Sequence, residues 1–290
     1  APGCKQTILY ALMGLGNPGE DVMLLSPSWA TYDAQIKLLG MNPIHVPVRR
    51  DNYHPDFDAM DSAITDKTSM ILINSPNNPT GAVYTPEEIE KIVKFAERND
   101  LWILSDEIYA TMTWMDWPHI SPATLPGGFE RTIVLGGWSK SWAMTGWRLG
   151  FMTGPENAMN ALFKCHANAA THVSTFLMPA AELALSCDEE VLEMTNAFKE
   201  RRNRIIEQLD GIKGLKVPTP EGAFYILMDV TGTGMDDMTF VKRALKEAKV
   251  QLIPGSLMEK GEGLVRISYA TTIDDIDEGC SRLRNWLNNL

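Results

Sequence analysis

The chain has 290 residues, 44% of them hydrophobic, so it can bury the core of one large domain or two ordinary domains. Its 26 lysines and arginines are outnumbered by 37 aspartates and glutamates, and the net charge of -11 argues against a nucleic-acid-binding surface. Four widely spaced cysteines, and no apolar run near the roughly 18 residues of a membrane span, indicate a reduced, cytoplasmic protein that does not enter membranes.

The first predicted element is an amphipathic helix that begins just after Gly3, with Cys4 and Lys5 in its first turn. Free N–H groups at a helix start can hold a phosphate, although an ordinary cap is the alternative. A turn and a buried strand at 19–25 then lead to Trp29, near the start of a second helix. A tryptophan at this position is a core residue or a flat surface for a planar ligand.

A rigid loop follows the predicted strand at 69–73. Its sequence, Asn74-Ser75-Pro76-Asn77-Asn78-Pro79-Thr80-Gly81, holds two prolines and a glycine, which exclude a regular element. Its asparagines either bond to their own backbone or face a ligand. A helix begins at Pro86 and ends near Asn99, and Glu87 and Glu88 in its first turn complement the helix dipole.

A carboxylate and a lysine follow the next two predicted strands. Asp106 and Tyr109 come directly after the apolar run 101–105, where a carboxylate either caps a helix or faces a cation. Lys140 lies in a loop of small residues after the strand 132–135, at the edge where open α/β sheets bind ligands. Because burial lowers the pKa of an amine, Lys140 is a candidate Schiff-base nucleophile, and a solvated lysine in a turn is the alternative.

Alternating strands and helices up to residue 150 predict a mostly parallel sheet covered on both faces. The later part has a different pattern, with closely spaced strands typical of a smaller α+β unit. We therefore expect a large domain at 1–196 and a small domain at 197–290. The further predicted strands are 44–48, 149–153, 224–228, 250–253 and 264–268, and the further helices are 57–64, 156–187 with a break near 173–179, 189–209, 237–248 and 273–287.

Five segments, in the same order along the chain, resemble class I aminotransferases that use pyridoxal 5′-phosphate (PLP), in particular the bacterial aspartate aminotransferase-like subgroup. The resemblance implies PLP-dependent transferase fold type I, an α/β fold with a mostly parallel seven-stranded sheet between helices and a smaller α+β C-terminal domain. The segments are Gly3-Cys4-Lys5, the Pro27 to Tyr32 segment, Asn78-Pro79-Thr80-Gly81, Asp106 to Tyr109, and Ser139-Lys140 with Gly146-Trp147-Arg148-Leu149-Gly150. A further match is Arg266 in Arg266-Ile267-Ser268, whose arginine binds the substrate carboxylate in the family.

The resemblance also implies a role for each matched residue. Lys140 would form the Schiff base and move protons, and Asp106 would pair with the protonated pyridine nitrogen, so that the ring can accept electrons. Asn78 and Tyr109 would bond to the phenolic oxygen of PLP, with Asn78 also at the substrate site, and Trp29 would stack on the ring. The cofactor phosphate would be held by Gly3, Cys4, Lys5, Ser139 and Arg148.

These roles predict an aminotransferase that moves an amino group between an amino acid, most simply an aspartate-like donor, and a 2-oxo acid such as 2-oxoglutarate. A homodimer is expected, since family active sites lie between two subunits. The family carries a further segment ahead of the Gly3 turn, so a PLP-binding chain with little activity is one alternative. A PLP-dependent C–S lyase and a non-catalytic effector-binding domain are others. A Rossmann dehydrogenase is disfavoured because no Gly-x-Gly-x-x-Gly motif joins a strand to a helix.

Overall fold

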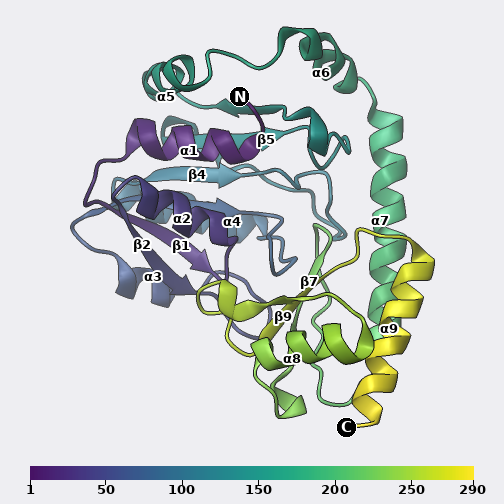
Figure 1. Cartoon of the computed structure of the whole chain (residues 1–290). Coiled ribbons are helices and arrows are strands. Elements are labelled where there is room, and N and C mark those ends of the chain that lie inside the picture. Colours follow the sequence, from purple (N-terminus) through teal and green to yellow (C-terminus); the bar gives the residue numbers. More distant parts are fainter.

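The structure, a computed structural model, describes residues 1–290 and contains two sheets and nine α-helices (Figure 1). The helices are α1 (Cys4–Leu15), α2 (Ala30–Leu38), α3 (Phe57–Ala63), α4 (Pro86–Arg98), α5 (Glu156–Ala169), α6 (Met178–Ala184), α7 (Asp188–Leu209), α8 (Asp237–Arg243) and α9 (Ile273–Asn288). The strands are β1 (Asp21–Ser26), β2 (Asn42–Pro47), β3 (Thr68–Asn74), β4 (Trp102–Asp106), β5 (Thr132–Gly137), β6 (Gly150–Thr153), β7 (Tyr225–Asp229), β8 (Ile253–Pro254) and β9 (Leu264–Ser268).

The larger sheet has six strands in the order β2-β1-β3-β4-β5-β6, all parallel except β6. The expected α/β architecture is confirmed, but the sheet has one strand fewer than the seven implied by the family resemblance. All six strands up to residue 153 belong to this sheet. The antiparallel β6 returns after the loop 138–149 without a crossover helix, whereas a parallel strand needs a crossover.

Both faces of this sheet are covered, because alternate strand residues point to opposite sides. Leu24, Leu72 and Leu104 pack in one cluster with residues of α1, α2 and α5. Met23, Ile71 and Ile103 point the other way and pack in a second cluster with residues of α3 and α4. Helix α4 is fixed at its start by a capping box between Thr85 and Glu88.

The smaller sheet is antiparallel in the order β7-β9-β8; α8 lies against it, and α9 packs on α7 and on the turn that follows α8. The strand predicted at 250–253 is wrong for most of its length, since only Ile253 and Pro254 pair with β9. The Val250 N–H instead donates to Ala244 O, in a π-helical turn that continues α8, and Lys249 adopts a left-handed φ of 60°. The helix therefore ends at Ala248, and residues 249–252 connect it to β8 without pairing in the sheet.

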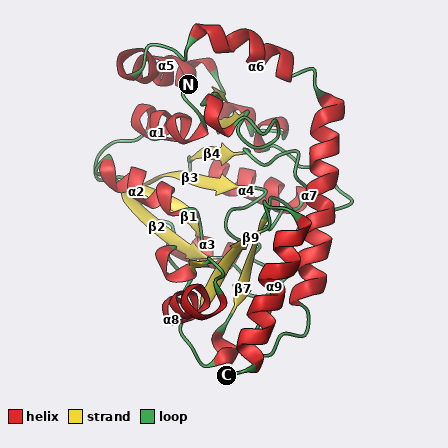
Figure 2. Ribbon diagram, turned by 45° about the vertical axis from the view of Figure 1, so that its right-hand side comes forward, coloured by secondary structure: helices red, strands yellow, loops and turns green.

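Helix α7 runs past the larger sheet to the smaller one and lies beside α9 (Figures 1 and 2). The Arg204 guanidinium ties the two helices together by pairing with Asp277 at 2.6 and 2.8 Å. The predicted break between α5 and α6 is confirmed. None of the helices combines the length and apolar character that crossing a bilayer requires.

Candidate active site

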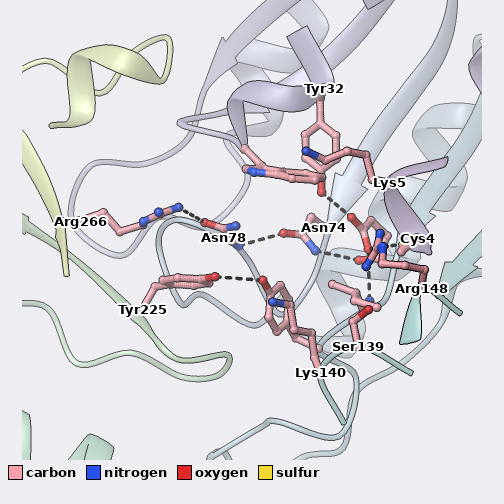
Figure 3. A pocket seen from close by; sticks show the side chains of 14 residues that line it. Cys4, Lys5, Tyr32, Asn74, Asn78, Ser139, Lys140, Arg148, Tyr225 and Arg266 are labelled. Carbon is pink, nitrogen blue, oxygen red and sulfur yellow. Dashed lines mark hydrogen bonds between the residues drawn. The ribbon is translucent and has the colours of Figure 1, made fainter. Parts of the chain in front are cut away.

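A cavity of about 290 Å³ opens at the carboxyl ends of the parallel strands (Figure 3). The parallel register places Asn74, the last residue of β3, opposite Asp106, the last residue of β4. The loop after β5 brings Lys140 to the same edge, and Arg266 reaches it from β9. All the residues predicted for the site line this cavity except Gly3, which lies behind Arg148.

Asp106 forms the buried end of the cavity, and only 2% of its surface is exposed. Its Oδ2 accepts a hydrogen bond from the Tyr32 hydroxyl at 2.6 Å, and its Oδ1 accepts from Ile108 N at 3.2 Å and from the Cys4 thiol at 3.5 Å. No cation pairs with it. Burial therefore raises the pKa of Asp106, although the hydrogen bond from Tyr32 opposes this. A carboxylate held this way is ready for a cationic ligand.

Asn74 links the backbone of Asp106 to the proline-rich loop. Its side-chain amide donates to Asp106 O at 2.9 Å, and its Oδ1 accepts from Asn78 N at 2.8 Å. The loop is also bonded internally, since Asn77 Oδ1 accepts from the amide and the hydroxyl of Thr80. The predicted rigid loop is thus present, and it fixes Asn78 relative to Asp106.

Arg266 lies on the opposite wall of the cavity. Its guanidinium donates to Asn78 Oδ1 at 2.8 Å and lies 4.7 Å from the centre of the Tyr225 ring. The Tyr225 hydroxyl is 3.3 Å from that of Tyr109. Burial raises the pKa of both phenols, so they remain protonated donors at neutral pH. The guanidinium forms no ion pair here, so it can bind a carboxylate.

The Lys140 amine lies over two aromatic rings, 5.2 Å from the centre of Phe224 and 5.9 Å from that of Tyr109. It makes no hydrogen bond or ion pair. Burial is the main cause that lowers the pKa of Lys140, and the positive charge of Arg148 adds to it. A lysine in this environment can lose its proton and act as a nucleophile or base.

The start of α1 forms an anion-binding corner with Ser139 and Arg148. The first N–H groups of the helix have no acceptor within it, and they carry the positive end of the helix dipole. Gly3 has a φ of 84°, and a Cβ there would overlap the Arg148 guanidinium. A Cβ on Gly150 would also collide with the backbone of Gly3 and Cys4. Glycine at both positions lets the helix start, the strand and the arginine approach one another.

Lys5 points away from this corner. Its amine lies 4.8 Å from the centre of the Trp29 ring, which makes an edge contact with Tyr32 at 5.4 Å. Lys5 forms no ion pair, and Gln35 donates to its backbone carbonyl at 3.0 Å. The backbone of Lys5 therefore belongs to the anion-binding corner, whereas its side chain is a free cation over the ring face of Trp29.

Three polar residues of the cavity were missed from the sequence, namely Tyr32, Asn74 and Tyr225. Tyr32 is three residues after Trp29, one helical turn further on, which is the signal that could have placed it on the same face. Asn74 ends a strand beside Asp106, so the parallel register could have placed it too. Tyr225 carries no comparable signal, because the approach of the smaller sheet brings it to the cavity.

The sequence and the fold of the chain are similar to those of known proteins. Residues 1–283 match the family model described as aminotransferase class I and II. The chain is 38% identical to an aspartate aminotransferase of Musicola paradisiaca, covering 95% of this chain and 70% of that protein. It is 39% identical to aromatic-amino-acid aminotransferase 2 of Thermococcus litoralis, covering 98% and 74%. The solved aromatic aminotransferase of Pyrococcus horikoshii superposes with a TM-score of 0.96 at 38% identity, covering 99% of this chain and 78% of that one.

Proposed function

The chain belongs to the class I and II aminotransferases, which are PLP-dependent enzymes, and we propose that its cavity transfers the amino group of an aspartate-like donor to a 2-oxo acid such as 2-oxoglutarate. One observation carries the proposal. A lysine of lowered pKa and a buried carboxylate without a cationic partner line the same cavity. The lysine suits the aldehyde group of PLP, and the carboxylate suits the ring nitrogen at the other end of the molecule.

The residues present fit PLP at four points. The anion-binding corner of Ser139, Arg148 and the α1 start would hold the phosphate. Asp106 would pair with the ring nitrogen, and Trp29 would cover one face of the ring. Asn78 and Tyr109 would bond to the phenolic oxygen. When bound, PLP supplies an electron-accepting ring that stabilises the electron pair left on the substrate Cα.

Lys140 would carry the proton transfers. Its lowered pKa favours the neutral amine, which can take a proton from the substrate Cα and return it elsewhere on the bound molecule. The rings of Phe224 and Tyr109 lie beside it and exclude water from one side of the amine. The proton is therefore passed back to the bound molecule and not to solvent. Asp106, kept ionised by its cationic partner, would hold the ring nitrogen protonated.

Arg266 would orient the substrate. Its planar guanidinium can form two parallel hydrogen bonds with an α-carboxylate, which fixes the carboxylate plane and so the direction of the Cα–H bond. Asn78, which it already touches at 2.8 Å, would complete this contact. The preference for an aspartate-like donor rests on Lys5, the remaining free cation of the cavity, which can pair with a second carboxylate.

We also propose that two copies of the chain associate. Large apolar side chains are exposed along α5, α6 and the segment between them, including Phe163 at 65%, Phe176 at 81% and Leu183 at 68% exposure. An apolar patch of this kind is uncommon on a protein that remains monomeric. The division into domains at residues 196 and 197 and the cytoplasmic location remain predictions.

A panel of amino acids tests the proposed function. The PLP-loaded protein is mixed with aspartate, alanine or phenylalanine, and the absorbance of the cofactor is followed. We expect aspartate to convert the cofactor to its amine form and to yield a 2-oxo acid, and added 2-oxoglutarate to reverse this conversion. Release of ammonia and sulfide from added cysteine, without that conversion, would identify a C–S lyase instead.

A further inference from the structure

A buried histidine outside the cavity joins the two sides of the active site. His54 is 5% exposed and lies between two carboxylates. Its Nδ1 is 2.6 Å from Glu88 Oε2, and its Nε2 is 2.9 Å from Glu221 Oε2. Neither carboxylate lines the cavity, so the proposed mechanism does not use this cluster.

Each carboxylate belongs to a segment that ends at the cavity. Glu88 closes the capping box of α4, directly after the loop that carries Asn78, and Arg49 also pairs with it at 2.9 Å. Glu221 lies four residues before Tyr225, and its Oε2 also accepts from Val83 N at 2.9 Å. His54 thus connects the loop of Asn78 with the segment of Tyr225.

The segment 220–225 is held against that loop by short backbone contacts. The N–H groups of Glu221 and Gly222 both donate to Gly81 O at 2.8 Å. A Cβ on Gly81 would collide with Tyr225 O at 2.8 Å, so the two segments touch without a side chain between them. A small shift of this segment therefore moves Tyr225 and the Arg266 guanidinium stacked on it.

The charge of the cluster favours a protonated imidazole. Burial alone would lower the pKa of His54, but hydrogen bonds to Glu221 and Glu88 outweigh it and raise the pKa to about 9. The other charged or titratable groups that face the cluster are Arg49, which binds Glu88, Arg202, which lies near Glu221 and donates to Pro220 O at 3.0 Å, and Tyr84, whose ring centre is 6.2 Å from that of His54. Burial raises the pKa of Tyr84, so it stays neutral in the same range.

We propose that His54 is a positioning residue for the substrate carboxylate. As a cation shared by Glu88 and Glu221, it fixes the segment 220–225 against the Asn78 loop. This holds Arg266 and Asn78 in contact before the substrate binds. The inference rests on the proposed role of Arg266. It predicts that loss of the His54 charge weakens binding of a carboxylate. PLP binding at the anion-binding corner of Ser139, Arg148 and the α1 start should not change, because other segments form that corner.

The first test needs no ligand. Hydrogen exchange of the amides of residues 221–225 is compared at pH 7 in the wild type, His54→Gln and the control His45→Gln. His45 is also bonded at both nitrogens, to Ser26 and Asp33 at 2.9 Å, but lies outside this cluster. We expect exchange about tenfold faster in His54→Gln only, because the segment opens locally. Equal rates in all three proteins would overturn the proposal.

The second test measures binding of succinate to the PLP-loaded proteins by tryptophan fluorescence between pH 7 and pH 10, a range in which succinate keeps its charge. We expect binding to His54→Gln to be about tenfold weaker at pH 7, and this ratio to approach one at pH 10, where the wild type has lost the same charge. PLP affinity should be equal in all three proteins. A ratio independent of pH would mean a merely structural role and would refute the inference.

If His54→Gln does not fold, the pH dependence of succinate binding to the wild type still tests the inference. The succinate affinity of the wild type should fall about tenfold between pH 7 and pH 10. A flat wild-type profile would overturn the inference. Failure of the proposed function looks different: PLP or succinate would not bind to the wild type at any pH, and the hydrogen-exchange comparison would still test the role of His54.

Discussion

The Tyr32 hydroxyl donates to Asp106 Oδ2 across 2.6 Å, at the most buried point of the cavity. Helix α2 carries both this tyrosine and, just ahead of its first residue, Trp29. One element therefore supplies the surface for one face of the ring and the donor that orients the carboxylate at the ring nitrogen. The hydrogen bond stabilises the ionised carboxylate and opposes the effect of burial on its pKa.

Substitution Tyr32→Phe is expected to lower kcat at least about tenfold, because a hydrogen bond to a charged group contributes about 1.5–3 kcal/mol. Asp106 would hold the ring nitrogen protonated less effectively. The measurement is the single-turnover rate with aspartate under saturating PLP. Tyr84→Phe is the matched control, since Tyr84 is equally buried but lies outside the cavity. Equal rates in the wild type and Tyr32→Phe would contradict the assigned contact.

Substitution Lys5→Gln is expected to change substrate preference. We expect kcat/KM for aspartate to fall about ten- to a hundredfold, the loss of one charge-assisted hydrogen bond. The value for phenylalanine should change little, because its side chain has no carboxylate. Both values are measured beside Lys37→Gln, a lysine on the exposed side of α2. Parallel losses for both substrates would show that Lys5 acts on the cofactor and not on donor choice.

The His54 cluster also predicts how stability depends on pH. The folded-state pKa of His54, about 9, is above the ordinary value of 6.5. Its contribution to stability is therefore complete below pH 6.5 and is lost as the pH rises through about 9. At about 1.4 kcal/mol for each pKa unit, the contribution reaches about 3 kcal/mol.

Thermal unfolding of the wild type and His54→Gln at several pH values measures this contribution. The Tm difference should be largest near pH 6 and nearly disappear at pH 10, whereas His45→Gln should show no such trend. A difference that stays constant with pH would show that the proton on His54 is not what stabilises the fold.

The sequence was most informative where one segment determines its own structure. The buried strands 69–73 and 101–105 are apolar runs bounded by turn residues; β3 extends the first by one residue at each end, and β4 is the second shifted by one residue. The strand expected at 250–253 failed because Val250 is apolar enough for a strand, but its N–H completes a helical turn. Hydrogen bonding at a helix end, which periodicity does not report, decided this segment.

The site was predictable to the extent that each motif occupies the end of a strand. Asp106 and Lys140 follow buried strands, so a parallel sheet brings them to one edge without further information. Tyr225 and the His54 cluster could not be foreseen, because they depend on how the smaller sheet approaches the larger one. The direction of the Lys5 side chain was also beyond a sequence argument, since it is set by the ring of Trp29.

The central claim is that PLP is bound covalently by Lys140, and chemical trapping tests it most directly. The protein is loaded with PLP, reduced with borohydride, digested and analysed by mass spectrometry. We predict a single pyridoxyl label on Lys140, absent from Lys140→Ala, which should still bind PLP through the phosphate corner of Ser139 and Arg148. A label on another lysine, or no label on the wild type, would contradict the account.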